Sequence, residues 1–306
     1  MIIQYTKSFL VIMALLLLSN IAFAYNVNDG PHIPNDIKLD NCPTTPDAYD
    51  RDFDHVMILI DKTSWLEKEQ KNWIKNSLFN ENFFQSYRPY TKFSLMFIDN
   101  KSVENQKLIY QKCRIKSGIK SKKWPTEIIS KSENAAIVGA WYKDALDEWV
   151  GQIDKIGTTV ESDNSFIFET IIRTIRDVDL GFDSANNPKR EIIIFSDLMQ
   201  HSNEFSFYRI CNATSNIRNM NKCPSFQSVL DKNEEIRDYI KYTDPRDTEN
   251  LTIKLKFMNF KHQSNEEINT SLINLWGDYF RKIGIEIPSN QLDWVERQLN
   301  FSGADE

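Results

Sequence analysis

Two uninterrupted apolar runs, each closed by an aspartate, constrain the fold of this chain more than any other feature. The first run is His55–Asp61 (HVMILID) and the second is Arg190–Asp197 (REIIIFSD). Continuous apolar segments of this length are typical of strands that are buried on both faces, as they are in parallel sheets. Both aspartates then follow the carboxyl ends of buried strands, where binding sites form in open parallel sheets.

Helical and strand-like patterns alternate along the rest of the chain. Apolar residues predict two further strands, over 92–99 and 251–260. Apolar stripes predict helices over 65–80, 135–156, 165–178, 225–242, 268–283 and 289–301. This order favours an α/β fold with a doubly wound, mainly parallel sheet flanked by helices. With no internal repeat or clean linker, residues 55–306 are expected to form one domain.

Two local expectations concern loops. Asn164 or Asp163 is placed to cap the helix that begins near residue 165. The stretch 100–132 is basic and includes Lys112 and Arg114. A charge run of this kind is typical of a solvated loop, the alternative being a patch that meets an acidic partner.

The N-terminus resembles a secretory signal peptide over residues 1–24. Lys7 precedes a short apolar run, and small residues at Ala22 and Ala24 form an A-x-A cleavage site. The run is shorter than the apolar stretch of about 20 residues that a membrane-spanning helix needs. We therefore expect export to the periplasm or beyond, the alternative being an uncleaved anchor. Residues 25–54 are polar and proline-rich, and are expected to form an extended arm.

The four cysteines, Cys42, Cys113, Cys211 and Cys223, predict disulfides in an exported chain. A Cys211–Cys223 bond would close a polar insertion at about 198–224, with a gain of about 3 kcal/mol from unfolded-state entropy. Cys42 would then pair with Cys113 and tie the arm to the body. Three pairings are possible in principle, and two free thiols are the alternative.

Composition and missing motifs exclude several function classes. With 37 basic and 43 acidic residues, a net charge of −6 leaves no broad basic field for nucleic acid. No Gly-rich phosphate loop occurs among only 9 glycines, which argues against nucleotide binding. No Gly-x-Ser-x-Gly hydrolase motif is present. An aspartyl phosphatase of the haloacid dehalogenase type needs a second Asp at position 63, where this chain has Thr63.

Oxygen-bearing side chains follow the two buried strands and open a later helix. Asp61 precedes Thr63 and Ser64, Asp197 precedes a polar turn, and Ser165 begins the predicted helix over 165–178. If the strands are neighbours, these groups meet at one edge of the sheet. Carboxylates and hydroxyls form a hard site, which suits Mg²⁺, Mn²⁺ or Ca²⁺ and not zinc or copper.

These residues resemble the metal-ion-dependent adhesion site of von Willebrand factor A domains. That site combines Asp-x-Ser-x-Ser after the first strand, a Thr that opens a later helix, and an Asp after the fourth strand. Here Asp61 and Thr63 match the first element, whereas Trp65 stands at the position of the second Ser. Ser165 corresponds to the helix-opening Thr, and Asp197 to the last Asp.

The resemblance covers roughly residues 54–285, and over 100–160 it holds only by element order. The chain also looks like exported bacterial proteins of this fold that occur in mobile-element and conjugation gene clusters and carry Ile-Asp-x-Thr, here Ile60–Thr63. The C-terminal pattern Leu275-Trp276-x-x-Tyr279-Phe280-x-x-x-Gly284 fits the same group.

The resemblance implies a protein-interaction module in which a partner's carboxylate completes the coordination of a bound cation. Residues that would line the contact face are Lys62, Ser64, Trp65, Gln200 and His201. Three alternatives stay open. In the first, the chain would be a metal-free structural envelope subunit, in which both aspartates bind loop amides or cap helices. In the second, it would be an Asp-dependent phosphatase or hydrolase. In the third, Trp65 would belong to the core instead of the contact face.

Overall fold

The computed structural model describes residues 54–63, 68–78, 81–88, 90–99, 106–114, 135–156, 164–176, 180–182, 189–202, 206–210, 225–232, 234, 237, 245–257 and 266–285. The predicted signal peptide, the arm before residue 54 and the predicted helix over 289–301 lie outside these residues. All of the described residues belong to one compact unit of the chain.

A five-stranded sheet in the order β3-β2-β1-β4-β5 forms the centre of this unit. Its strands are β1 (His55–Asp61), β2 (Lys92–Ile98), β3 (Leu108–Cys113), β4 (Arg190–Ser196) and β5 (Leu251–Phe257). Four of them run parallel, and only β3 pairs antiparallel, with β2. The four predicted strands are present, so the prediction of an α/β fold with a mainly parallel sheet is confirmed.

Strand β3 is a departure from the prediction, because the basic stretch around it was expected to be a solvated loop. Lys112 and Arg114 are each only 1% exposed. The Lys112 ammonium lies 2.6 Å from the Asp144 carboxylate, which is itself exposed. The aliphatic part of a lysine can be buried while its charged end reaches a partner at the surface. The expectation of solvated side chains is therefore wrong at these two positions.

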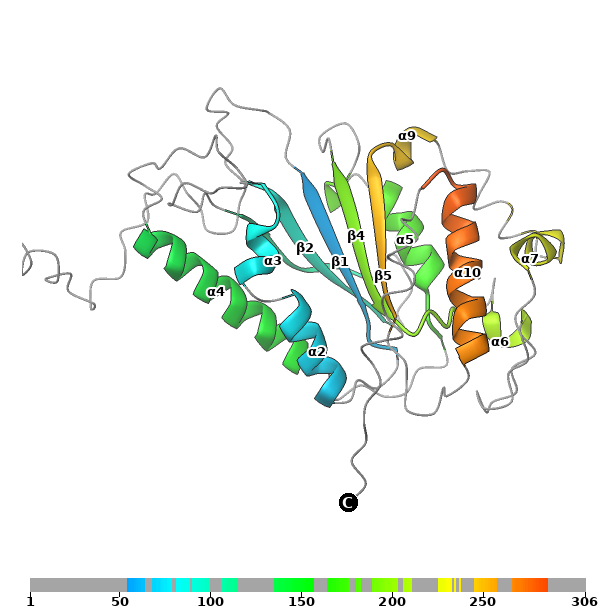
Figure 1. The fold of residues 1–306 in the computed structure, drawn as a ribbon, viewed down its shortest axis with the longest axis horizontal. Coiled ribbons are helices and arrows are strands. Elements are labelled where there is room, and N and C mark those ends of the chain that lie inside the picture. The colour runs from blue at the N-terminus through cyan, green and yellow to red at the C-terminus, as the bar shows by residue number, and fades with distance from the viewer. Residues whose placement is uncertain are drawn as a thin grey trace, which may run out of the picture. The chain divides into compact units, whose positions relative to one another are not determined.

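Helices cover both faces of the sheet (Figure 1). On one face lie α2 (Lys68–Leu78), α3 (Glu81–Gln85) and α4 (Ala135–Asp154). On the other lie α5 (Ile167–Arg176), α7 (Phe226–Lys232) and α10 (Glu266–Lys282). Alternate residues of β1 enter the two cores: Ile58 and Ile60 face α2 to α4, whereas Met57 and Leu59 face α5 and α10. This two-sided burial explains why the strand sequences are continuously apolar.

The strand order reverses between β1 and β4. From β1 the chain goes outward to β2 and β3, and it then returns on the other side of β1 to form β4 and β5. Two short helices, α6 (Phe207–Ile210) and α9 (Pro245–Thr248), lie in the connection from β4 to β5. In open sheets of this kind, ligands bind at the carboxyl ends of the strands where the order reverses. The topology therefore points to the ends of β1 and β4.

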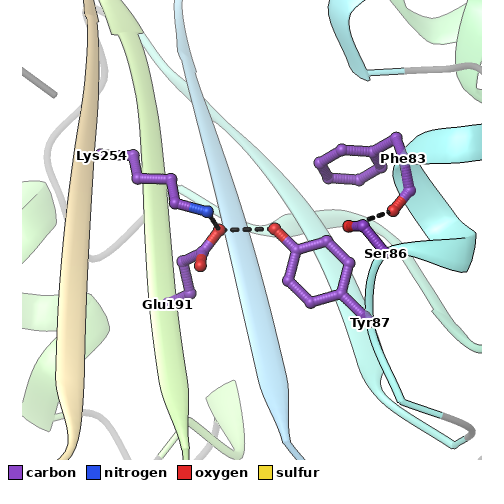
Figure 2. A network of polar contacts seen from close by, with 5 residues as sticks. All are labelled: Phe83, Ser86, Tyr87, Glu191 and Lys254. Carbon is purple, nitrogen blue, oxygen red and sulfur yellow. Dashed lines mark hydrogen bonds and ion pairs between the residues drawn. The ribbon is translucent and has the colours of Figure 1, made fainter. Parts of the chain in front are cut away.

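A polar network near the amino end of β4 joins the turn after α3 to the edge strand β5 (Figure 2). The carboxylate of Glu191 accepts a hydrogen bond from the Tyr87 hydroxyl and lies 2.7 Å from the Lys254 ammonium. Burial, together with the adjacent Glu191 carboxylate, raises the pKa of Tyr87. Glu191 is the second residue of β4, so this network lies at the other end of the strand from Asp197 and serves the packing of the fold.

His55 is a fully buried imidazole at the start of β1. Its Nδ1 lies 3.0 Å from the carbonyl oxygen of Gly181, and its Nε2 lies 2.8 Å from the Ser94 hydroxyl. A carbonyl only accepts, so Nδ1 carries the proton and Nε2 accepts from Ser94. Burial lowers the pKa of His55 well below 6.5, and the nearby charges of Lys92 and Arg190 lower it further.

We predict that His55 weakens the fold in acid. Its pKa in the unfolded chain is the ordinary one, so below about pH 6.5 the unfolded state binds a proton that the folded state does not. Stability should fall by up to about 1.4 kcal/mol per pH unit through this group. Urea unfolding of wild type and His55→Gln at about pH 7.5 and about pH 5.5 measures the difference. An equal loss of stability in both proteins would contradict the prediction.

Candidate functional site

The carboxylate of Asp61 gathers three hydroxyl groups at the carboxyl end of β1. Asp61 is 2% exposed. Its Oδ1 accepts hydrogen bonds from the backbone N–H of Thr63, at 3.0 Å, and from the Thr63 hydroxyl, at 2.6 Å. Its Oδ2 accepts from the hydroxyls of Ser196, at 2.7 Å, and Ser165, at 3.3 Å. Ser165 and Ser196 are 104 and 135 residues from Asp61 along the chain, so three separate segments meet at one carboxylate.

A second buried carboxylate, Asp197, lies beside this cluster at the end of β4. Its Oδ1 accepts a hydrogen bond from the Met199 backbone N–H at 2.9 Å, in the same two-residue pattern that joins Asp61 to Thr63. Burial raises the pKa of Asp197 to about 7, and the neighbouring Asp61 carboxylate contributes to the rise. Burial also raises the pKa of Asp61, although its bonds from Thr63 and Ser196 oppose that effect. The two groups therefore repel each other in a dry environment when both are ionised, which for Asp197 requires a pH above about 7.

The sheet register explains why β1 and β4 deliver these groups to one point. The two strands are parallel neighbours, and Ile60 lies opposite Phe195. The next residues, Asp61 and Ser196, are the last of their strands and lie close enough for their side chains to bond. Ser165 arrives separately, through an antiparallel bridge with His201 in which each backbone N–H donates to the other residue's carbonyl, at 2.7 and 3.0 Å. The structure thus brings together Asp61, Thr63 and Ser165, as predicted from the sequence, and places Asp197 next to them.

The backbone turns sharply after Asp197. Leu198 has a φ of +60°, a left-handed conformation that is uncommon for a residue other than glycine. Its N–H donates to the Ser196 hydroxyl at 2.8 Å, and its carbonyl accepts from the Trp276 indole N–H at 3.0 Å. Strained backbone of this kind persists where surrounding contacts hold it in place.

Two further residues belong to the site but were not predicted as part of it. Ser196 donates directly to Asp61, and the signal for it was its position as the last residue of β4, immediately before Asp197. Tyr208, on α6, is close enough that Asp197 and Asp61 add to the effect of burial and raise the pKa of its hydroxyl. Its ring contacts His201 edge-on, with the centroids 5.4 Å apart. No sequence pattern links Tyr208 to the strand ends.

The residues predicted to contact a partner have different environments. Lys62 is half-buried, and its ammonium lies 3.6 Å from the Asp99 carboxylate. His201 is half-buried, and its Nδ1 lies 2.7 Å from the Ser206 hydroxyl. Ser64 and Trp65 lie outside the described residues, so their roles stay predictions.

Gln200 was predicted to line the contact face, but its side chain is fully buried. Its side-chain oxygen accepts from the Phe168 backbone N–H at 2.8 Å, in the first turn of α5. Its amide nitrogen donates to the Glu169 carboxylate at 2.9 Å. Gln200 thus satisfies an N–H in the first turn of α5. The cap expected from Asn164 or Asp163 stays a prediction, and Asp163 lies outside the described residues.

Cys113, the last residue of β3, is disulfide-bonded. Cys42, Cys211 and Cys223 lie outside the described residues, so the pairing of the four cysteines stays a prediction. Of the insertion predicted at about 198–224, the structure describes only residues up to 202 and 206–210.

The donor set at Asp61 has the chemistry of a hard cation site. A hydroxyl that donates its hydrogen to Asp61 keeps lone pairs for a cation, so the hydroxyls of Thr63 and Ser165 can serve as ligands while they remain bonded to the carboxylate. A divalent cation would also neutralise the repulsion between Asp61 and Asp197. Within the described part of the chain, no group of three or more His, Cys, Asp and Glu side chains could hold a metal ion. The candidate site instead depends on two carboxylates and on hydroxyls.

No protein-family model matches this chain, and no curated protein matches it. Across the described residues, no helix has the length and apolar character that crossing a membrane requires. The candidate site therefore has to be interpreted from its own geometry.

We predict that Asp197→Asn stabilises the protein when divalent cations are removed with EDTA. The folded state holds the Asp197 proton up to about pH 7, against 3.8 for the ordinary group. Stability is therefore full below about pH 4 and falls as the pH rises towards 7. At about pH 8 the variant avoids a cost on the order of a few kcal/mol, while an amide oxygen can still accept from Met199.

Thermal unfolding in EDTA at about pH 8 and about pH 4 measures this effect. The control is Asp99→Asn, which removes a carboxylate that is paired with Lys62 and should give no gain. A wild type as stable as Asp197→Asn at the higher pH would show that no charge repulsion is stored at this site.

Proposed function

We propose that this protein is an exported protein-interaction module of the von Willebrand factor A type, with a three-layer sandwich fold. A divalent cation, most simply Mg²⁺, would bind at the carboxyl edge of the sheet and accept a carboxylate from a protein partner in the cell envelope, in a conjugation-related complex or a similar assembly. The observation that carries the proposal is the meeting of Asp61, three hydroxyls and Asp197 where the strand order reverses.

The proposal assigns different tasks to the two carboxylates. Both oxygens of Asp61 accept two hydrogen bonds each, so Asp61 orients the hydroxyls and supplies negative charge. Thr63, Ser165 and Asp197 are then the groups that would hold the cation. Mg²⁺ normally keeps several waters, so water can stand where the family has the hydroxyl that Trp65 replaces. A bound cation attracts anionic groups, which favours an acidic partner.

The alternatives receive less support from the site. In an aspartyl phosphatase, Asp61 would attack as a nucleophile and would need an oxygen with free lone pairs. Four donors already saturate the about four lone-pair positions of this carboxylate. A metal-free structural subunit gains nothing from two buried carboxylates that raise each other's energy at neutral pH. The bonds to Thr63 and Met199, and the hydroxyls that donate to Asp61, satisfy buried carboxylates with or without a metal, so they agree with that alternative as well.

We predict that Mg²⁺ or Mn²⁺ raises the melting temperature of the wild type and that Asp61→Ala abolishes the effect. Ligand at about 100 times its Kd contributes about 2.7 kcal/mol, or several degrees for a chain of this size. Thr63→Val provides a milder test, because it removes one hydroxyl and preserves volume. Its control is Thr174→Val, which removes a buried hydroxyl that bonds the Thr170 carbonyl in α5. The proposal is wrong if neither ion stabilises the wild type.

Partner binding follows from the same site. We predict that the wild type, incubated with envelope extract of its host, retains a partner in Mn²⁺ and releases it in EDTA, whereas Asp61→Ala retains none. Thr174→Val should behave as the wild type does. An identical set of retained proteins for the wild type and Asp61→Ala, with or without the ion, would place the interface elsewhere.

A further inference from the structure

The geometry points to Trp276 as the residue that positions the cation site. Trp276 lies on α10 and is fully buried. It contacts three segments that carry the site: the turn after Asp197, the first turn of α5 and the start of α6. This inference rests on the proposed cation site, and it adds α10, which packs on one face of the sheet, to the elements that hold the site in place.

The first contact holds the strained turn. The Trp276 indole N–H donates to the carbonyl of Leu198, whose left-handed conformation turns the chain immediately after Asp197. The same carbonyl also accepts from the Gln200 backbone N–H at 3.1 Å. Loss of the indole N–H would therefore leave that carbonyl bonded, so a variant should fold, but one of the two restraints on the turn would be gone.

The second and third contacts are made by the ring. Trp276 stacks on Phe168, with centroids 4.2 Å apart, and meets Phe207 edge-on at 5.7 Å. Phe168 lies three residues after Ser165, and its N–H is bonded to Gln200. Phe207 directly precedes Tyr208, and its N–H donates to the Gln200 carbonyl at 3.0 Å. One side chain thus packs against the segments that carry Ser165, Asp197 and Tyr208.

A ligand group is effective only when it is held close to its productive geometry, and outer contacts supply that restraint. The indole ring of Trp276 supports one hydroxyl and one carboxylate of the site at once. Binding equilibria are reciprocal, so a cation that fixes these loops also fixes α10 against them. Occupancy of the site is therefore coupled to the docking of α10 on the sheet.

The test replaces Trp276 by Phe, which keeps an aromatic ring and removes the indole N–H. The control is Trp149→Phe, the same substitution at a fully buried indole in the other core, on α4. Mn²⁺ affinity is measured by electron paramagnetic resonance, and stability by urea unfolding. We expect the Kd for Mn²⁺ to rise by about tenfold or more in Trp276→Phe, the usual cost of losing an outer contact, and to be unchanged in Trp149→Phe.

Hydrogen exchange in EDTA gives a second measurement that needs no metal. Backbone N–H groups over 197–202 should exchange faster in Trp276→Phe than in the wild type or Trp149→Phe. The inference would be overturned if Trp276→Phe exchanged over 197–202 at the same rate as the wild type and bound Mn²⁺ with the same affinity. A wild type that binds no Mn²⁺ would overturn the proposed function, and exchange over 197–202 would still decide whether Trp276 positions the turn.

Discussion

The buried carboxylate of Asp61 is the constraint on which the arrangement at this edge of the sheet depends. An ionised group out of water is costly unless donors surround it, and a carboxylate offers about four positions to satisfy. The chain supplies four donors from three segments: Thr63 next to Asp61, Ser196 on the neighbouring strand, and Ser165 before α5. Any rearrangement that moved one of these segments away would leave part of the carboxylate unsatisfied. The need to solvate one charge therefore holds three loops in place.

Charge is distributed unevenly along the strands. His55, Lys92 and Arg190 are in register at the amino ends of β1, β2 and β4, whereas Asp61 and Asp197 follow the carboxyl ends of β1 and β4. At the amino end the buried imidazole stays neutral, and Arg190 donates to backbone carbonyls of Phe182, Asp247 and Glu249. At the carboxyl end the Asp61 carboxylate contributes to the raised pKa of Asp197, so these two groups repel when both are ionised. A protein retains such a destabilising arrangement where function requires it.

Much of the architecture could be predicted because burial on both faces leaves a direct trace in sequence. The strands at His55–Asp61 and Arg190–Ser196 are continuous apolar runs, and both were predicted to within one residue. Strand β3 could not be predicted in the same way, because it is an antiparallel edge strand that contains a buried lysine. The aliphatic part of Lys112 is buried, and its ammonium pairs with Asp144. Amino-acid type alone does not distinguish that arrangement from a solvated charge run.

The sequence by itself determined that carboxylates end the two buried strands and that hydroxyls follow Asp61 and precede α5, because strand burial and helix starts are local patterns. Only the tertiary structure decided that β1 and β4 are neighbours, and so that Ser196 bonds Asp61 and that Asp197 lies beside it. It also buried Gln200 against the Phe168 N–H in the first turn of α5 and set Trp276 against the turn at Leu198. These contacts join residues that are distant along the chain, and their formation depends on which strands pair and in which register.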